Sequence, residues 1–331
     1  MNSNNKEFKC PCDPFNRRHT VSGTDGVKSA IGHADVGNQA PHGNLVTGIP
    51  MKMRKLKILE DELSRHNINI CGISETHWKD NGHFHTEANV VYFSGNAESS
   101  KNEVAFIIPK SSRNCVLGYE PVSDRLISIK LKASPVNFNI IQVYAPTSTA
   151  CSEDIESFYS DLETAICKIP QRELLVIMGD FNSKIGSDSH LLSPCVGKYG
   201  LGQRNERGER LVQFAADNNL VICNSFFQNH PRRLYTWISP DGNYRNQIDY
   251  ILVRARWKTS IRNTYTLPGA DCGSDHQFLM AKIRLKLRAV WKIVQHRRLE
   301  VRDKPQFTTA LGKEWDQWVS VDHNTESPDK M

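Results

Sequence analysis

The sequence predicts a layered α/β sandwich in which two mixed sheets lie inside and helices lie outside. Hydrophobic residues make up 39% of the 331-residue chain, which is enough for a large core. Short β-branched apolar runs recur along the chain and are bounded by polar residues, Gly or Pro, as in strands of a covered sheet. Because a few amphipathic helical patterns interrupt these runs, the elements favour stacked layers of sheet and helix.

The first predicted element is a helix, because Leu56, Leu59 and Leu63 recur at helical spacing up to Arg65. The apolar run 68–73 follows it and predicts a buried strand. The remaining predicted elements are strands at 104–108, 126–131, 138–144, 174–178, 220–223, 248–253 and 278–287, and helices at 153–168 and 206–219.

Three regions are predicted along the chain, and the folded domain covers residues 51–288. Residues 1–50 are rich in Asn, Gly, Ser and His and have no sustained apolar period, so we expect a disordered N-terminal tail. Residues 289–331 are charged and contain scattered Trp residues. We expect them to form a charged C-terminal extension that is partly helical, over 310–318.

The net charge decides little, whereas the cysteines and the hydropathy of the chain bear on its location. The formal net charge is +6, from 42 basic and 36 acidic residues, which permits a polyanionic partner without requiring one. Basic residues crowd the last third, as on a solvated surface or on one that faces phosphates. Nine cysteines match no zinc motif, so we expect reduced thiols. Because no secretory signal and no apolar run of roughly 20 residues is present, we expect an intracellular protein without a membrane partner. The short basic run at 296–298 does not decide between cytosol and nucleus.

Polar side chains follow the ends of three predicted strands. Glu75 follows one strand directly, and Tyr144 ends another. A third strand leads into Gly179–Asn182, where Gly permits a sharp turn and Asp180 and Asn182 can both face one pocket. Ligands gather beyond the carboxyl ends of strands, so we expect these side chains at one site. Taken alone, Glu75 is more often an ordinary surface residue and Tyr144 a packed ring.

A further carboxylate lies inside an otherwise apolar strand. Asp249 interrupts the run 248–253, where burial of a carboxylate is costly unless it is paired. The motif Ser274-Asp275-His276 supplies a partner, because a carboxylate that holds one ring nitrogen of a histidine fixes its tautomer and raises its basicity. Taken alone, Asp249 and His276 form either a catalytic pair or a satisfied structural pair.

Six short motifs then occur in a recognisable order. They are Ser-Glu-Thr-His at 74–77, Tyr-Ala-Pro at 144–146, Gly-Asp-Phe-Asn at 179–182, Tyr-Thr-Trp at 235–237, Ile-Asp-Tyr at 248–250 and Ser-Asp-His at 274–276. Their order resembles that of the exonuclease–endonuclease–phosphatase superfamily. The fuller strings at 142–148, 232–237 and 268–276 resemble the apurinic-type endonuclease domain of non-LTR retrotransposons and craniofacial development protein 2-like proteins. This resemblance covers about residues 51–288 and implies a four-layered α/β sandwich.

The resemblance implies hydrolysis of DNA phosphodiester bonds with a divalent ion, Mg²⁺ or Mn²⁺, and with no small organic cofactor. Glu75 would bind the ion, and Asp275 would assist the metal or the leaving group. Oxygen ligands of this kind suit Mg²⁺. A phosphodiester is anionic and repels a hydroxide nucleophile, so a hard cation and hydrogen-bond donors must neutralise the charge that develops. We expect the protein in the nucleus rather than the cytoplasm, and the sequence does not identify its protein partners.

The resemblance also implies roles for the residues that match its other motifs. Asp180 would orient and deprotonate the attacking water. Asn182 and Tyr144 would hold the scissile phosphate. His276, oriented by Asp249, would stabilise the charge that builds on the phosphate oxygens.

Two features depart from the pattern of this family. Its members usually open with a strand that bears a Trp-Asn pair, whose Asn lies in the catalytic pocket. Residues 44–50 occupy that place without the motif, so we expect the opening strand to be missing and assign no role to Asn44. Glu103 stands where relatives tend to have Gly. A missing strand would affect activity more than fold.

Three functions follow from these observations. The first is a retrotransposon-derived, Mg²⁺-dependent endonuclease that nicks DNA by in-line attack of water. The second is a catalytically impaired nucleic-acid-binding or chromatin-associated protein that retains the fold. The third is a phosphatase or phosphodiesterase that acts on lipid or inositol phosphates, and the retroelement-like strings argue against it.

Overall fold

The computed structural model describes residues 42–47, 56–96, 102–188, 193–270 and 273–285, together with residues 309, 312 and 313. The chain divides into two units, Met1–Lys286 and Leu287–Met331. The three described residues of the second unit are helical, and the rest of the predicted C-terminal extension lies outside the described residues. Residues 1–41 of the predicted N-terminal tail also lie outside them. All elements below belong to the first unit.

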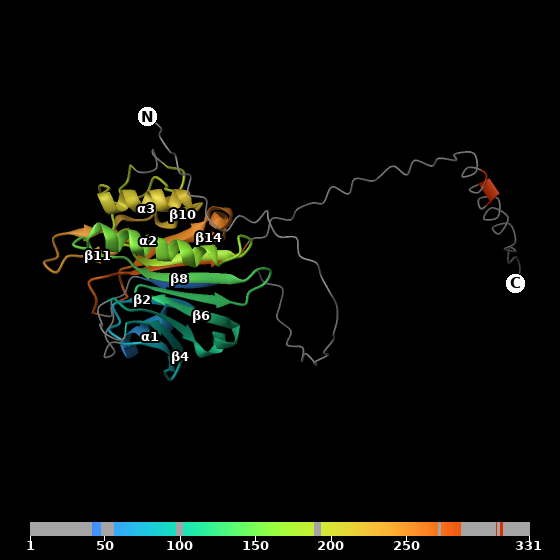
Figure 1. Ribbon diagram of the computed structural model, residues 1–331, viewed down its shortest axis with the longest axis horizontal. Helices are drawn as coiled ribbons and strands as arrows, with labels where there is room; N and C mark the ends of the chain where they lie inside the picture. The colour runs from blue at the N-terminus through green and yellow to red at the C-terminus, as the bar shows by residue number, and fades with distance from the viewer. Residues whose placement is uncertain are drawn as a thin grey trace, which may run out of the picture. The chain divides into compact units, whose positions relative to one another are not determined.

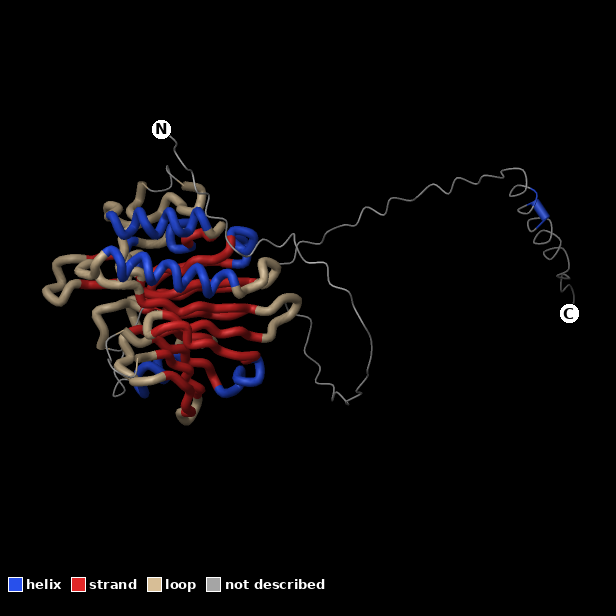
Figure 2. Tube along the Cα trace, in the orientation of Figure 1, coloured by secondary structure: helices blue, strands red, loops and turns tan. Residues whose placement is uncertain are grey.

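Two large mixed sheets form the centre of the first unit (Figures 1 and 2). The strand order is β14-β15-β1-β2-β5-β4-β3 in the seven-stranded sheet and β10-β13-β9-β8-β7-β6 in the six-stranded sheet. Each sheet contains one parallel pair, β1 with β2 and β8 with β9, and its other pairs are antiparallel. A short separate hairpin joins β11 to β12.

The strands have the following bounds: β1 His42–Thr47, β2 Ile70–Ser74, β3 Asn81–His85, β4 Asn89–Ser94, β5 Val104–Pro109, β6 Val116–Ser123, β7 Leu126–Leu131, β8 Phe138–Tyr144, β9 Leu174–Asp180, β10 Leu220–Ile222, β11 Trp237–Ile238, β12 Arg245–Asn246, β13 Asp249–Arg254, β14 Ile261–Leu267 and β15 Phe278–Arg284. The α-helices are α1 Leu56–Arg65, α2 Ser152–Cys167 and α3 Glu206–Asp217. Short 3₁₀ helices among the described residues are Lys110–Cys115, Cys223–Phe226, Pro231–Arg233 and Ala255–Ser260.

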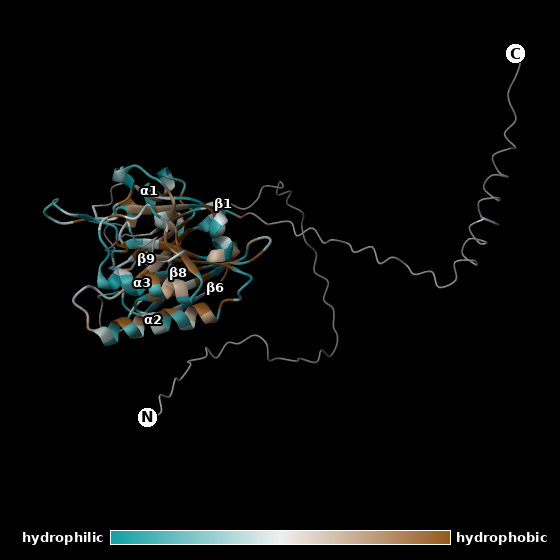
Figure 3. Cartoon of the chain, turned by 90° about the horizontal axis from the view of Figure 1, so that it is seen from above, coloured by the Kyte–Doolittle hydropathy of each residue, from teal (hydrophilic) through white to brown (hydrophobic). Residues whose placement is uncertain are grey.

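Helices cover the outer faces of both sheets and complete four layers. The apolar side of α1, with Leu59 and Leu63, packs on the seven-stranded sheet. α2 and α3 pack on the six-stranded sheet through residues such as Leu162 and Phe214. Figure 3 shows hydrophobic and hydrophilic residues alternating along α2, as expected of a helix with one buried face. A third cluster, which includes Phe106 and Met178, fills the space between the sheets. The predicted four-layered sandwich is confirmed.

The prediction that no strand precedes residue 51 is wrong. β1 lies inside the seven-stranded sheet, antiparallel to β15 and parallel to β2. Its sequence gives a weak signal because Gly43 and Asn44 have low strand propensity and two adjacent residues, Leu45 and Val46, supply its apolar content. Pairing with a strand on each side satisfies the backbone groups of β1, and this long-range contribution is not visible in a local pattern.

None of the described helices is both long and apolar enough to cross a membrane.

A buried polar bridge joins the two sheets beneath the ends of β1, β2 and β8. The hydroxyl of Thr47 donates to Gln142 Oε1 (3.0 Å), and Gln142 Nε2 donates to Ser74 Oγ (3.2 Å). Gly72 makes room for this bridge, since a Cβ at that position would lie 1.9 Å from Gln142 Oε1. The bridge therefore requires glycine at position 72.

Gly72→Ala is expected to lower the free energy of unfolding by about 2 kcal/mol, because the added methyl group overpacks a fully buried side chain. The measurement is urea unfolding followed by circular dichroism. Gly118→Ala is the matched control: Gly118 also lies in a strand, a Cβ added there would have no heavy atom within 4 Å outside its chain neighbours, and the expected change is below about 0.5 kcal/mol. Equal effects of the two substitutions would contradict the inter-sheet bridge.

Candidate active site

A cleft of about 500 Å³ lies where strands of both sheets end. Glu75 follows β2, Tyr144 ends β8 and Asp180 ends β9, so three strands present polar side chains to one opening. The residues that line it are Glu75, Tyr144, Thr147, Ser148, Asp180, Asn182, Lys184, Asn205, Trp237, Asn246, Ile248, Asp275 and His276. The cleft thus brings together six of the seven side chains singled out in the sequence, and the seventh, Asp249, lies behind His276.

Asp249, His276 and Asp180 form a buried array at the base of the cleft. His276 Nδ1 lies 2.9 Å from Asp249 Oδ2, and His276 Nε2 lies 4.0 Å from Asp180 Oδ2. The two carboxylates face each other across a strand pair, since Asp249 in β13 is directly opposite Asp180 in β9. Asp249 is fully buried, so its carboxylate fixes the imidazole from the inner side and leaves Nε2 toward the cleft.

Burial and neighbouring charges perturb both ends of this array. Burial lowers the pKa of His276, but the charge and hydrogen bond of Asp249, with Asp180 and Asp275 nearby, outweigh it and raise this pKa to about 10. Burial and the charge of Asp249 raise the pKa of Asp180 to about 8, against the lowering effect of His276. A positively charged imidazole therefore lies beside a carboxyl group whose pKa is near neutral pH.

Local hydrogen bonds at the end of β9 hold Asp180 in place. Its Oδ1 accepts the backbone N–H of Asn182 (2.8 Å), and Asn182 takes a left-handed φ of 46°, which Asn adopts more readily than most residues. The Asn182 side-chain amide donates to the carbonyl of Ala145 (2.8 Å), and the Ala145 N–H donates to the carbonyl of Asp180 (2.8 Å). These bonds join the ends of β8 and β9.

On the opposite side of the cleft, the hydroxyl of Tyr144 donates to Glu75 Oε1. Burial and the carboxylate of Glu75 raise the pKa of Tyr144, so its phenol stays protonated and remains a donor. Arg125 also supports Tyr144, because its guanidinium donates to the Tyr144 carbonyl (3.3 Å) and lies 5.5 Å from the ring centre. The sequence contained no signal for Arg125.

The hairpin β11–β12 brings a further residue to the site. Trp237 Nε1 donates to Asp275 Oδ2 (2.9 Å), and the backbones of Trp237 and His276 form an isolated antiparallel bridge. The neighbouring Thr236 hydroxyl accepts the N–H groups of Ile248 (3.0 Å) and Asp249 (3.1 Å). Thr236 and Trp237 thus orient the Asp249–His276 pair and Asp275. Their motif, Tyr-Thr-Trp, was the available signal, but it did not reveal these contacts.

Asn44 lies away from the cleft. Its backbone N–H donates to Asn69 Oδ1 (2.9 Å) and its side-chain amide donates to the carbonyl of Asn67 (3.1 Å), both just before β2 begins. Glu75 follows the other end of β2. The opening strand is therefore present, and Asn44 is held at the end of the sheet that is remote from the cleft.

The donor set of the cleft fits a hard divalent cation. Glu75 and Asp275 both line it, and the described hydrogen bonds engage one oxygen of each carboxylate, with Tyr144 and Trp237 respectively. The second oxygens are available as ligands of the kind that Mg²⁺ prefers. Ligand atoms of Asp180, Asp249 and His276 also lie within 4.8 Å of one another. We favour a hydrogen-bonded array for those three, because Asp249 already binds the histidine ring in a fully buried position.

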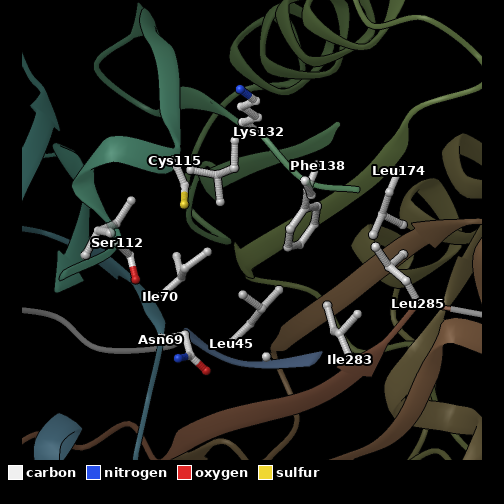
Figure 4. A pocket seen from close by; sticks show the side chains of 14 residues that line it. Leu45, Asn69, Ile70, Ser112, Cys115, Lys132, Phe138, Leu174, Ile283 and Leu285 are labelled. Carbon is white, nitrogen blue, oxygen red and sulfur yellow. The ribbon is translucent and has the colours of Figure 1, made fainter. Parts of the chain in front are cut away.

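A second cavity, of about 200 Å³, lies between the sheets near the starts of β2, β8 and β9 (Figure 4). Its walls are largely apolar and include Leu45, Phe138 and Leu174. No acidic residue or histidine occurs among the described residues that line it, so it lacks the carboxylate oxygens that a Mg²⁺ site needs. The candidate active site is therefore the polar cleft at the other end of these strands.

Comparisons with known proteins agree with this geometry. The model of the Endonuclease/Exonuclease/phosphatase family matches residues 52–276. Craniofacial development protein 2 of Bos taurus is 44% identical over 242 residues, which cover 73% of this chain and 40% of that protein. The chain thus spans about two fifths of the length of the curated relatives it matches.

Two solved structures share the fold at low sequence identity. One is the endonuclease domain of TRAS1, a telomere-specific non-LTR retrotransposon, with a TM-score of 0.54 and 16% identity over 75% of this chain and 100% of that domain. The other is the 3′ phosphatase NExo from Neisseria bound to a product DNA hairpin, with a TM-score of 0.55 and 18% identity over 73% of this chain and 100% of that chain. Both support the arrangement of sheets and helices described above.

Proposed function

Because the chain belongs to the endonuclease/exonuclease/phosphatase family, we propose that it is a Mg²⁺-dependent endonuclease that hydrolyses DNA phosphodiester bonds in the polar cleft. One observation carries the proposal: Asp249 holds His276 at 2.9 Å, and the outer ring nitrogen of His276 lies 4.0 Å from Asp180. A proton acceptor and a positive charge thus lie side by side, which is what attack of water on an anionic phosphate requires.

Glu75 and Asp275 would hold the divalent ion, Mg²⁺ or Mn²⁺. When bound, the ion would neutralise negative charge on the scissile phosphate. Tyr144 would keep the Glu75 carboxylate oriented, and Trp237 would do the same for Asp275. No small organic cofactor is needed for this chemistry.

Asp180 would accept the proton of the attacking water through Oδ2, the oxygen that faces His276. Burial and Asp249 raise the pKa of Asp180 to about 8, so its ionised form is a stronger base than an ordinary Asp, and the fraction in that form grows as the pH rises toward 8. The N–H of Asn182 holds the other oxygen at 2.8 Å, so the carboxylate keeps one orientation as the water approaches.

The charge that develops on the phosphate oxygens would be stabilised by His276. Because Asp249 and the nearby carboxylates raise its pKa to about 10, the imidazole is positively charged at neutral pH and donates through Nε2. Asn182 lines the same cleft and would hold the scissile phosphate. Tyr144 would do so when the phosphate replaces Glu75 as the acceptor of its hydroxyl. Lys184 adds a further cation at the cleft wall.

DNA is the proposed substrate for two reasons. The TRAS1 domain with the same fold is an endonuclease, and NExo is bound to a DNA hairpin. The full-length relative is named for craniofacial development, which points to no particular substrate. We therefore propose a retrotransposon-derived nuclease domain that acts on DNA in the nucleus.

The second candidate function is that of a catalytically impaired nucleic-acid-binding or chromatin-associated protein. The position of Asn44 favours it, because family members carry a pocket Asn on the opening strand and here Asn44 is bonded to Asn67 and Asn69 at the other end of the sheet. A pocket without this polar group would have lower activity, while the basic residues in the last third of the sequence could still bind phosphates.

One set of assays separates these functions. The purified full chain is incubated in Mg²⁺ with supercoiled plasmid or with inositol phosphates, and plasmid binding is measured in parallel. Nicking of the plasmid supports the endonuclease. DNA binding without nicking would favour the impaired protein, and release of phosphate from inositol phosphates without nicking would replace the endonuclease by a phosphatase.

A further inference from the structure

The loop after β2, which carries Glu75 into the cleft, has a constrained backbone. Three of its non-glycine residues have left-handed φ values: Glu75 at 53°, His77 at 57° and Asp80 at 62°. Side chains with a Cβ rarely adopt this conformation, so surrounding contacts must impose it. The direction of the Glu75 carboxylate depends on these contacts.

Glu103 supplies two of the contacts that constrain this loop. It lies immediately before β5, the neighbour of β2, and its side chain is fully buried. Its carbonyl accepts the N–H of Thr76 (3.2 Å), and its carboxylate oxygen Oε2 accepts the N–H of His77 (3.2 Å). One residue thus binds two successive backbone amides of the loop, directly after Glu75.

The Glu103 side chain packs in a space that depends on glycine at position 95. A Cβ at position 95 would lie 2.7 Å from Glu103 Cγ and 2.3 Å from the carbonyl of Trp78. Glycine at position 95 therefore leaves the space in which the Glu103 stem and the loop backbone pack together. The contact is specific to this side chain and this loop.

The Glu103 carboxylate is costly to bury. Its second oxygen, Oε1, is buried and has no hydrogen-bond partner among the described residues. A buried polar atom without a partner destabilises the fold, and an apolar side chain of similar shape would avoid this cost. The benefit that offsets it is the hydrogen bond to the loop that carries Glu75.

We propose that Glu103 is a positioning residue for Glu75: its hydrogen bonds to the loop set the orientation in which Glu75 meets the divalent ion. This inference rests on the proposed function in so far as Glu75 is taken as a metal ligand. Glu103 does not touch the cleft, since it is absent from the residues that line it. Its effect reaches the metal through the backbone of residues 75–77.

Two substitutions of the full chain test the proposal. Glu103→Met fills the same space without an acceptor, and Glu103→Gln keeps an acceptor for the His77 N–H. Three quantities are measured for each variant: Mn²⁺ affinity by isothermal titration calorimetry, the Mg²⁺ concentration that gives half-maximal plasmid nicking, and the thermal unfolding temperature without metal.

Glu103→Met is expected to unfold at the same or a higher temperature, because the unpartnered carboxylate is gone. Its Mn²⁺ affinity is expected to fall about tenfold, as is typical when support for a metal ligand is removed. Glu103→Gln is expected to stay close to the wild-type affinity. A merely structural role would instead lower the unfolding temperature and leave the affinity of the folded protein unchanged.

Unchanged Mn²⁺ affinity in Glu103→Met, a folded Glu103→Gln that loses affinity, or a Glu103→Met that does not fold would each overturn the proposal. Different results would reject the proposed function. A wild-type chain that binds Mn²⁺ but does not nick DNA rejects the endonuclease and still allows Glu103 to be tested by binding. A wild-type chain that binds no Mn²⁺ rejects the metal site and this inference together.

Discussion

Asp180→Asn is expected to reduce the rate of plasmid nicking about a thousandfold, because an amide cannot accept the proton of the attacking water. Geometry is expected to survive, since an Asn at this position can still accept the N–H of Asn182 that now binds Asp180 Oδ1 at 2.8 Å. The measurement is the single-turnover rate of conversion of supercoiled plasmid to open circle in Mg²⁺.

The same substitution is expected to stabilise the metal-free fold at neutral pH. Asp180 ionises near 3.8 in an unfolded chain, whereas burial and Asp249 raise its pKa to about 8 in the folded protein. The folded state therefore holds a proton that the unfolded state has lost, so the free energy of unfolding of the wild-type protein falls as pH rises from 3.8 to about 8. Asp180→Asn removes this pH-dependent loss of stability.

The control for Asp180→Asn is Glu163→Gln, which neutralises an exposed carboxylate on α2 that is not among the residues lining the cleft. Glu163→Gln is expected to nick DNA at the wild-type rate. If Asp180→Asn retained that rate as well, Asp180 would not be the base. If Asp180→Asn lost activity together with its folded circular dichroism spectrum, the loss would reflect unfolding.

His276→Ala is expected to cost both stability and activity. Asp249 is fully buried, its Oδ2 binds the histidine ring, and its Oδ1 has no partner among the described residues. Removing the ring leaves a buried charge without compensation, which destabilises a fold by about 3 kcal/mol. Nicking is expected to fall at least about a hundredfold, because a cation beside the phosphate is lost.

The double variant Asp249→Asn/His276→Ala identifies the cause of the lost stability. Neutralising residue 249 removes the uncompensated charge, so urea unfolding is expected to show the double variant more stable than His276→Ala alone. Its nicking rate is expected to remain as low as that of the single variant. A double variant that is less stable than His276→Ala would contradict the account of a charge pair and indicate a packing role for the ring.

The sequence predicted the helices and strands whose buried apolar residues recur at a regular spacing. Leu56, Leu59 and Leu63 mark the buried face of α1, and strands such as β9, whose residues are all buried, appear as continuous apolar runs. The prediction of family membership is likewise confirmed, by a match over 52–276. β1 was missed because its place depends on two distant partners, β2 and β15. β3 was missed because an edge strand with alternating exposure and residues such as Gly82 has little apolar signal.

The site was predictable where a single residue conflicts with its local pattern. Asp249 within an apolar strand required a partner, and the structure has His276 at 2.9 Å from it. The contacts of Trp237 with Asp275 and of Glu103 with the loop of Glu75 were not predictable, because each joins segments far apart in sequence through one or two hydrogen bonds. Nothing in a local pattern records such a bond.

The most direct test of a metal-dependent endonuclease in this cleft is a chelation and rescue experiment. Nicking of supercoiled plasmid by the full chain is followed in Mg²⁺, then after excess EDTA, then after Mg²⁺ is restored, with Asp180→Asn prepared in the same way. We expect nicking to stop with EDTA and to return with Mg²⁺ in the wild-type protein alone. Nicking that persists in EDTA, or that is equal in the two proteins, would contradict the assignment.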